Sequence, residues 1–330
     1  MSRPEQPEPF LRGCAWPAGA GVAYPRADPT DFARLPIDTW ATAQLPVTVR
    51  LEIVGDAELV EVEYRTATDD FGYRGAGAGT TFAVWRDGVR VAEEPAVLGE
   101  GTVSLGLGRH ASDSPAVVYL PEGMKPTVSS VRAIGGSIEP APHGPRWVAY
   151  GDSILEGWAA SGPARAWPAI AARAFRLDVV NLGYAGSARG EIVSAEHIAS
   201  LPADVISISH GTNCWTRTPH SFDQMVANTA AFLDVVRQGH PQTPIVVTTP
   251  VLRPDAEQTP NRLGATLDDL RRAMENAVCR RADMGDECLT VVTGSGLLTA
   301  DQLPDGIHPG DEGHEILARA FGAAVAETSS

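Results

Sequence analysis

The sequence predicts an α/β fold class with two domains: an antiparallel β-sandwich and then a doubly wound parallel sheet with helices on both faces. Three observations lead to this prediction. The chain has 330 residues, which is long for one domain. Its first half alternates apolar and polar residues in short runs. Its second half alternates short apolar runs with long helical stretches.

The runs of the first half are rich in valine and threonine and are separated by turn residues. Such alternation is typical of strands that turn one face toward a core. Arg86-Asp87-Gly88 lies between two of these runs, as a hairpin turn would. Regular short strands of this kind predict an antiparallel sandwich. The runs cover 45–55, 57–67, 80–92, 101–108 and 115–123.

The runs of the second half are apolar at nearly every position, which is typical of parallel strands covered on both faces. Between them, apolar side chains recur at spacings of three and four residues and predict helices that pack on a sheet. In 261–283 this stripe consists of Leu263, Leu267, Leu270, Met274 and Val278. The strands are expected at 147–150, 177–183, 203–211, 243–250 and 288–294, and the helices near 163–175, 220–239, 261–283 and 310–326.

These patterns divide the chain into four parts. Residues 1–13 are expected to be a mobile tail, and 14–138 the β-sandwich domain. A proline-rich linker follows at 139–146, and the α/β domain covers 147–328.

The chain is acidic, with 26 basic and 41 acidic residues and a formal net charge of −15. A field of this sign repels phosphate backbones and anionic lipids, so neither nucleic acid nor membrane is expected as a partner. The acidic surface is explained equally well by solubility alone. The N-terminal residues lack the apolar core of a secretory signal, and no stretch approaches the length of a membrane helix. We therefore expect a cytoplasmic protein.

The cysteines and histidines do not form a recognisable metal or disulfide pattern. The four cysteines, at 14, 214, 279 and 288, are too few for a disulfide framework and form no CxxC pair. No HExxH or comparable ligand set is present. Neither a metal nor another cofactor is expected.

Residues that can carry chemistry directly follow the predicted parallel strands. Open α/β sheets bind ligands at the carboxyl ends of their strands, so these residues are expected at one rim. A nucleophilic serine needs a base, an acid that orients the base, and donors for the developing oxyanion. Four turns supply candidates for these roles: Gly151-Asp152-Ser153-Ile154, Gly183-Tyr184-Ala185-Gly186-Ser187, Gly211-Thr212-Asn213-Cys214 and Asp305-Gly306-Ile307-His308-Pro309.

Each turn has an ordinary structural explanation when it is taken singly. A Gly-Asp-Ser tripeptide is commonly a turn, and Asn213 is typical of a turn whose side chain satisfies its own backbone. His308, which precedes a proline, is typical of a loop. The order of the four turns, their places at strand ends and their complementary roles favour a catalytic site.

Residues 147–326 resemble the SGNH (GDSL-type) hydrolase family, whose sequence blocks occur here in the expected order. The resemblance implies a flavodoxin-like sheet, preceded by a jelly-roll-like form of the β-sandwich domain. It also implies that Ser153 attacks an acyl carbonyl, that His308 removes its proton and that Asp305 holds the imidazole. The oxyanion hole would be formed by the N–H groups of Ser153 and Gly186 and by the Asn213 side chain.

The match to the family pattern has two departures. Cys214 stands where the third block usually ends in Asp, and Ser187 stands where the second block often has Asp. Neither change removes a catalytic group.

Several neighbouring residues have competing interpretations. Asp152 is interpreted as a carboxylate that stabilises its turn, and His210 as a strand-end histidine with a satisfied hydrogen bond. His314 is expected to be exposed on the last helix. Trp158 and Trp215 each follow a catalytic block, and they are expected either to line a substrate pocket or to pack as core or rim residues.

Three functions remain open. The first is an esterase or deacetylase that forms an acyl-enzyme on Ser153, with an acylated sugar among its candidate substrates. The second is an O-acyltransferase that passes the acyl group to a hydroxyl of a natural product or sugar. The third is an inactive carbohydrate-binding module, against which the intact set of catalytic residues argues. A small-molecule acyl ester is the expected substrate for both enzymes.

Overall fold

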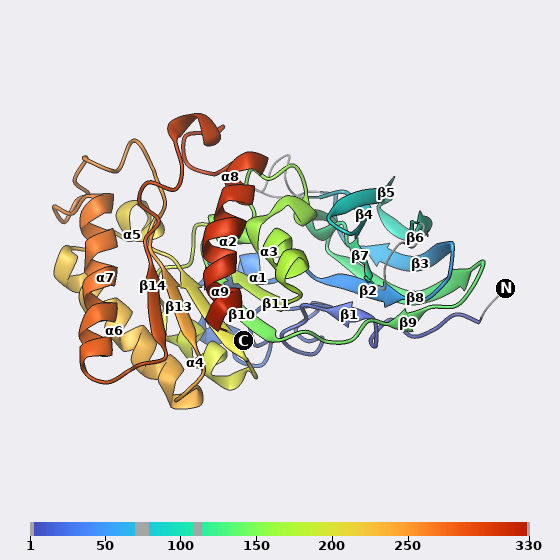
Figure 1. Ribbon diagram of the computed structural model, residues 1–330, viewed down its shortest axis with the longest axis horizontal. Helices are drawn as coiled ribbons and strands as arrows, with labels where there is room; N and C mark the ends of the chain where they lie inside the picture. Colours follow the sequence, from blue (N-terminus) through green and yellow to red (C-terminus); the bar gives the residue numbers. More distant parts are fainter. Residues whose placement is uncertain (1–2, 70–78, 109–113, 329–330) are drawn as a thin grey trace.

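The computed structural model describes residues 3–69, 79–108 and 114–328. The β strands of the first half lie at one end of an elongated molecule, and the helices and parallel strands of the second half lie at the other (Figure 1).

The second half forms a five-stranded parallel sheet with the strand order β11-β10-β12-β13-β14. This order is the flavodoxin-like one, in which the chain starts near the middle of the sheet and moves outward in both directions. The predicted α/β fold class is therefore confirmed. The strands are β10 (Arg146–Gly151), β11 (Asp178–Gly183), β12 (Val205–Ser209), β13 (Ile245–Thr248) and β14 (Leu289–Val292).

Helices cover both faces of this sheet because successive side chains of each strand point to opposite faces. In β10, Val148 and Tyr150 join a core with α4, α6 and α7, whereas Trp147 and Ala149 join a second core with α3, α8 and α9. The helices are α3 (Trp167–Phe175), α4 (Ile192–Ser200), α6 (Phe222–Gly239), α7 (Leu267–Asp283), α8 (Asp311–Leu317) and α9 (Ala323–Thr328).

One predicted helix begins later than its apolar stripe suggested. The side-chain oxygen of Asn261 accepts hydrogen bonds from the N–H groups of Leu263 and Ala265, which forms a turn. A capping box between Thr266 and Asp269 then starts α7, so Leu263 is half exposed and is not part of the buried stripe.

The N-terminal region contains two antiparallel sheets, with the strand orders β1-β2-β7-β4-β5 and β6-β3-β8 in the described residues; β9 also pairs with β2. Residues of both sheets, such as Leu51, Val62 and Val118, share one hydrophobic core. The predicted hairpin turn joins β4 to β5, with Asp87 and Gly88 at positive φ. The strands are β1 (Leu11–Arg12), β2 (Arg50–Val54), β3 (Leu59–Thr66), β4 (Thr81–Arg86), β5 (Val89–Pro95), β6 (Gly99–Gly106), β7 (Ala116–Tyr119), β8 (Pro126–Ile134) and β9 (Glu139–Pro140).

The described part of the expected mobile tail, residues 3–13, packs against these sheets. Glu5 pairs with Val131, and Phe10 is only 1% exposed. The expectation failed because polar and proline residues dominate this segment, so its single buried aromatic gave no periodic signal.

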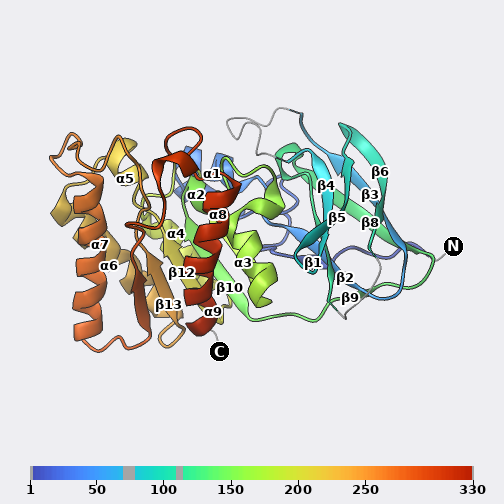
Figure 2. The ribbon, with the colours of Figure 1, turned by 45° about the horizontal axis from the view of Figure 1, so that its top comes forward.

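The segment that follows the tail belongs to the α/β core although the sequence placed it in the sandwich. Ala27, Leu35 and Ala43 pack in the same core as β10, and α1 (Ile37–Ala43) lies among elements of the α/β domain in both views (Figures 1 and 2).

The guanidinium of Arg26 attaches this segment to the parallel sheet. It is 1% exposed and donates hydrogen bonds to the carbonyls of Thr42 (2.7 Å), Asn181 (3.2 Å) and Gly183, with the Glu156 carboxylate 3.8 Å away. A buried cation with these partners fixes the segment from Arg26 to Leu45 on the end of β11, because moving this segment would leave the charge buried without its partners.

A second contact joins the β4/β7 face to α3. Arg173 donates a hydrogen bond to the Tyr119 hydroxyl (2.6 Å), and its guanidinium lies 4.6 Å from the ring centroid of Trp85. Apolar atoms of Ala164 and Ala169 pack against the same two rings. The two halves therefore share buried surface in place of a flexible tether.

Contrary to expectation, His314 is fully buried. Its Nδ1 accepts a hydrogen bond from the N–H of Trp167 (3.2 Å), and its Nε2 lies 3.1 Å from the Trp158 carbonyl, to which it donates. The ring thus ties α8 to the start of α3 and to the loop after β10. Burial lowers the pKa of His314 to about 4.

The shared surface predicts that residues 145–330 alone are less stable than the whole chain. Loss of the N-terminal region exposes the apolar face around Ala164 and removes Arg26 from the end of β11. We expect a fall in Tm of roughly 5–10 °C and stronger binding of a hydrophobic dye. Thermal unfolding followed by circular dichroism measures the change in Tm. An unchanged Tm together with unchanged dye binding would contradict the prediction.

The burial of His314 predicts a loss of stability in acid. The unfolded histidine has a pKa of about 6.5. Because the folded pKa is lower, the contribution of this group is present above about pH 6.5 and is lost as the pH falls toward 4. Its full size is about 3 kcal/mol. The free energy of unfolding in urea should therefore fall less between pH 7.5 and pH 4.5 in His314→Gln than in the wild type.

The exposed His143 provides the matched control. His143→Gln should keep the pH dependence of the wild type, and an equal change in both variants would refute the assignment to His314.

Candidate active site

Ser153 is the first residue of α2 (Ser153–Glu156), directly after β10. The sharp turn needs Gly151, because a Cβ there would lie 2.4 Å from the Ser209 carbonyl oxygen. Asp152 caps α2, its carboxylate accepting a hydrogen bond from the Ile154 N–H (3.0 Å), as the sequence analysis expected. Burial raises the pKa of Asp152 to about 6, although the charge of Arg253 lowers it in part.

His308 reaches Ser153 from a loop 155 residues further along the chain. Its Nε2 lies 2.8 Å from the Ser153 Oγ, and its Nδ1 lies 2.6 Å from the Asp305 Oδ2. The other Asp305 oxygen accepts the N–H groups of Ile307 (3.0 Å) and His308 (2.7 Å), so the carboxylate both folds its own turn and meets the ring.

The geometry fixes the proton positions. The Asp305 carboxylate accepts a hydrogen bond from the Nδ1 of His308, so the neutral ring carries its proton at Nδ1. The Nε2 lone pair then accepts a hydrogen bond from the Ser153 hydroxyl. Burial of Asp305 raises its pKa, but the hydrogen bonds from the His308 ring and from the two N–H groups outweigh this, so its pKa lies below the ordinary value. The carboxylate therefore stays ionised near neutral pH.

Two further predicted residues follow the strands on either side of β10. Gly186, at φ 73°, follows β11, and Asn213 begins α5 (Asn213–Thr216) after β12. The Asn213 Nδ2 donates to the carbonyl of Ala188 (3.2 Å), two residues after Gly186. An amide nitrogen carries two hydrogens, so this bond orients the side chain and leaves one donor for a ligand.

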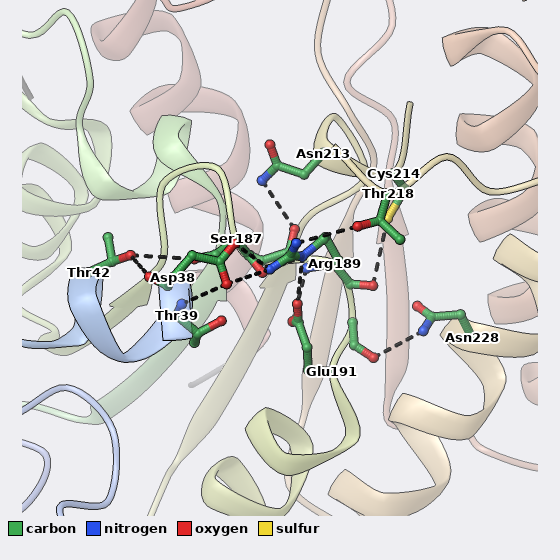
Figure 3. A network of polar contacts seen from close by, with 12 residues as sticks. Asp38, Thr39, Thr42, Ser187, Arg189, Glu191, Asn213, Cys214, Thr218 and Asn228 are labelled. Carbon is green, nitrogen blue, oxygen red and sulfur yellow. Dashed lines mark hydrogen bonds and ion pairs between the residues drawn. The ribbon is translucent and has the colours of Figure 1, made fainter. Parts of the chain in front are cut away.

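A polar network that the sequence analysis missed holds the loop after Gly186 (Figure 3). The Arg189 guanidinium bonds both oxygens of Asp38 in α1 (2.7 and 2.9 Å) and the Glu191 carboxylate (2.9 Å). In the same loop, the Ser187 hydroxyl lies 3.4 Å from that of Thr42. Asp38 and Arg189 are 151 residues apart, so no local pattern could have indicated their contact.

The departure at Cys214 leaves Asn213 supported in another way. The Cys214 side chain is fully buried, and its Sγ lies 3.7 Å from the Arg189 carbonyl. The thiol thus packs beneath the loop that Asn213 contacts.

The two tryptophans have different surroundings. The Trp158 ring lies beside the His308 ring, with centroids 5.2 Å apart. Trp215 instead contacts the loop after β13: its Nε1 donates to the Thr259 carbonyl (2.9 Å), and the Arg253 guanidinium lies 4.9 Å from its ring centroid.

His210 lies beneath the site. It is 1% exposed, packs against Tyr150 and Phe232, and burial lowers its pKa to about 4. Contrary to the sequence analysis, neither ring nitrogen has a hydrogen-bond partner of good geometry in the described residues, although the Asn228 side chain is its polar neighbour. Its burial against two aromatic rings makes it part of the core.

The described residues contain no cluster of three or more side chains suited to hold a metal ion. Nor do their helices include one that is both long and apolar enough to cross a membrane.

Three solved structures resemble the chain over most of its length. A salicylyl-acyltransferase, SsfX3, from a tetracycline biosynthetic pathway is 27% identical, with a TM-score of 0.82 over 98% of this chain and 97% of that one. A structure described as a GDSL-like lipase, from Bacteroides ovatus ATCC 8483, is 20% identical (TM-score 0.79, 99% and 97% covered). A family two carbohydrate esterase from Clostridium thermocellum, in complex with cellohexaose, is 16% identical (TM-score 0.61, 84% and 91% covered). The last two show the fold alone.

No curated protein matches the chain in sequence. The model of the GDSL-like lipase/acylhydrolase family matches residues 149–316, which is slightly more than half of the chain. This span includes the turns of Ser153, Gly186, Asn213 and His308. Together with structural neighbours that are esterases or an acyltransferase, the match makes this protein an enzyme that acts on ester bonds. The chain belongs to the GDSL-like lipase/acylhydrolase family.

Proposed function

We propose that this enzyme hydrolyses small acyl esters through an acyl-enzyme on Ser153. The observation that carries the proposal is the chain of short contacts from the Ser153 Oγ through His308 to Asp305, 2.8 and 2.6 Å long. A hydroxyl, a base and a carboxylate in this order form an activated nucleophile.

The reaction runs in two halves. In the first, His308 Nε2 takes the Ser153 proton while the Oγ attacks the ester carbonyl, and Asp305 stabilises the imidazolium. The tetrahedral intermediate then collapses, the proton passes from His308 to the leaving alcohol, and the acyl group stays on Ser153. In the second half His308 takes a proton from water as the water attacks the acyl carbonyl. The second tetrahedral intermediate then collapses, the acid leaves, and the proton passes from His308 back to the Ser153 Oγ.

The negative charge of the tetrahedral intermediate needs donors that are already in place. We assign the N–H groups of Ser153 and Gly186 and the free hydrogen of the Asn213 amide to this role. The bond between Asn213 and Ala188 supports the assignment, because it holds the side chain in one orientation before substrate binds. Trp158, beside His308, is the side chain we assign to the wall of the acyl pocket.

A second candidate function is transfer of the acyl group to a hydroxyl other than that of water. The observation that favours it is the likeness to SsfX3 over nearly the whole of both chains, which includes the N-terminal region as well as the part matched by the family model. Both functions share every step up to the acyl-enzyme, and they differ only in the nucleophile of the second half.

The nucleophile assignment predicts that a fluorophosphonate labels Ser153, because a triad-activated hydroxyl attacks phosphorus as it attacks carbonyl carbon. Peptide mapping by mass spectrometry should find the label there, and Ser153→Ala should abolish both labelling and turnover of p-nitrophenyl acetate. Ser161, whose hydroxyl bonds Asp311, is the matched control, and Ser161→Ala should still be labelled. A label on another serine of the folded protein would overturn the proposal.

The fate of the acyl-enzyme separates hydrolysis from transfer. If water is the acceptor, adding a sugar or phenolic alcohol should leave the yield of free acid per p-nitrophenol released at one to one. We expect this ratio for hydrolysis, measured by chromatography of the products. A ratio that falls with acceptor concentration while a new ester accumulates would establish the acyltransferase instead.

A further inference from the structure

We propose that Arg217 binds an anionic group of the substrate, a carboxylate or phosphate, beside the ester that Ser153 attacks. The inference rests on the proposed function and names a substrate class for it. It depends on the position of the Arg217 guanidinium and on its lack of a partner among the described residues.

Arg217 is fixed to the same turn as Asn213. The N–H groups of Arg217 (2.9 Å) and Thr218 (3.0 Å) both donate to the Asn213 carbonyl, so the backbone of this turn is closed. From there the side chain reaches back over Gly186. The guanidinium therefore lies beside Gly186, one of the three groups assigned to the oxyanion hole.

The orientation of the guanidinium leaves its donors available. A Cβ placed on Gly186 would be 3.8 Å from Nε, 3.8 Å from Nη2 and 3.9 Å from Cζ of Arg217. Because these three distances are nearly equal, Gly186 faces the flat side of the guanidinium and not its edge. The N–H bonds lie in the plane of the group, so they point sideways and away from Gly186.

The charge of Arg217 has no counter-ion in the described part of the chain. Arg189 is paired with Asp38 and Glu191, and Arg253 with Asp255, whereas the exposed side chain of Arg217 makes no hydrogen bond or ion pair there. In a chain with a net charge of −15, an unpaired cation at the rim of the site attracts an anion locally. The planar fork of a guanidinium matches carboxylate and phosphate oxygens.

This inference predicts a preference for charged esters that depends on Arg217. Two pairs of esters locate the charge: p-nitrophenyl hydrogen adipate against p-nitrophenyl hexanoate for the acyl half, and 4-acetoxybenzoate against its methyl ester for the alcohol half. In the pair whose charge Arg217 binds, Arg217→Ala should lower the ratio of kcat/KM for the charged ester to that for the neutral ester about fivefold to tenfold. The change should come chiefly from a higher KM for the charged ester. Arg217→Lys should lower it less, and about 1 M NaCl should reduce the wild-type ratio.

The control is Arg319→Ala, which removes another exposed arginine from the segment after α8 and should keep both ratios. An equal loss on charged and neutral esters would overturn the inference and make Arg217 a stabiliser of the oxyanion. Unchanged ratios in both pairs would overturn it as well. If the wild type is labelled at Ser153 and turns over the neutral esters, either failure concerns Arg217 alone. If no ester is turned over and Ser153 is not labelled, the proposed function fails with it.

Discussion

The constraint on which the site depends is the parallel direction of five neighbouring strands. Because β10, β11 and β12 run the same way in register, the residues that follow them emerge at one edge of the sheet. Ser153, Gly186 and Asn213 are such residues, so they meet although they are up to 60 positions apart. His308 comes from a loop, and its place is fixed by the Asp305 carboxylate, which accepts two backbone N–H groups of its own turn.

A second constraint is the need to satisfy buried cations. Arg26 and Arg50 are both nearly inaccessible to solvent, and each takes partners from the α/β domain: backbone carbonyls at the end of β11 for Arg26, and Asp178 at its start for Arg50. Removing one member of such a buried set costs about 3–5 kcal/mol, because the remaining charge stays desolvated. The N-terminal region is thus attached at both ends of the strand that leads to Gly186.

The N-terminal segment also reaches the loop of Gly186, which we propose as an oxyanion donor. Asp38 and Thr42, one helical turn apart in α1, contact Arg189 and Ser187 on that loop. Ser187 stands where the family often has a carboxylate, and in this chain the carboxylates of Asp38 and Glu191 bind the loop through Arg189. The loop is held by residues from both halves of the chain.

The sequence by itself determined the α/β class, the hairpin at Asp87-Gly88, and the four turns that meet at the rim. These features follow from local signals: apolar periodicity, turn chemistry and the residues next to strand ends. Only the tertiary structure decided where residues 3–45 lie, that His314 is buried and that α7 starts at a cap after Leu263. It also decided that Arg189 is paired, whereas Arg217 has no partner among the residues that the structure describes. Each of these depends on a partner distant in sequence or on competition between a turn and a helix. The identity of one residue does not reveal its partner. An arginine can be solvated, ion-paired or buried with its charged end bonded, and its neighbours in sequence do not say which.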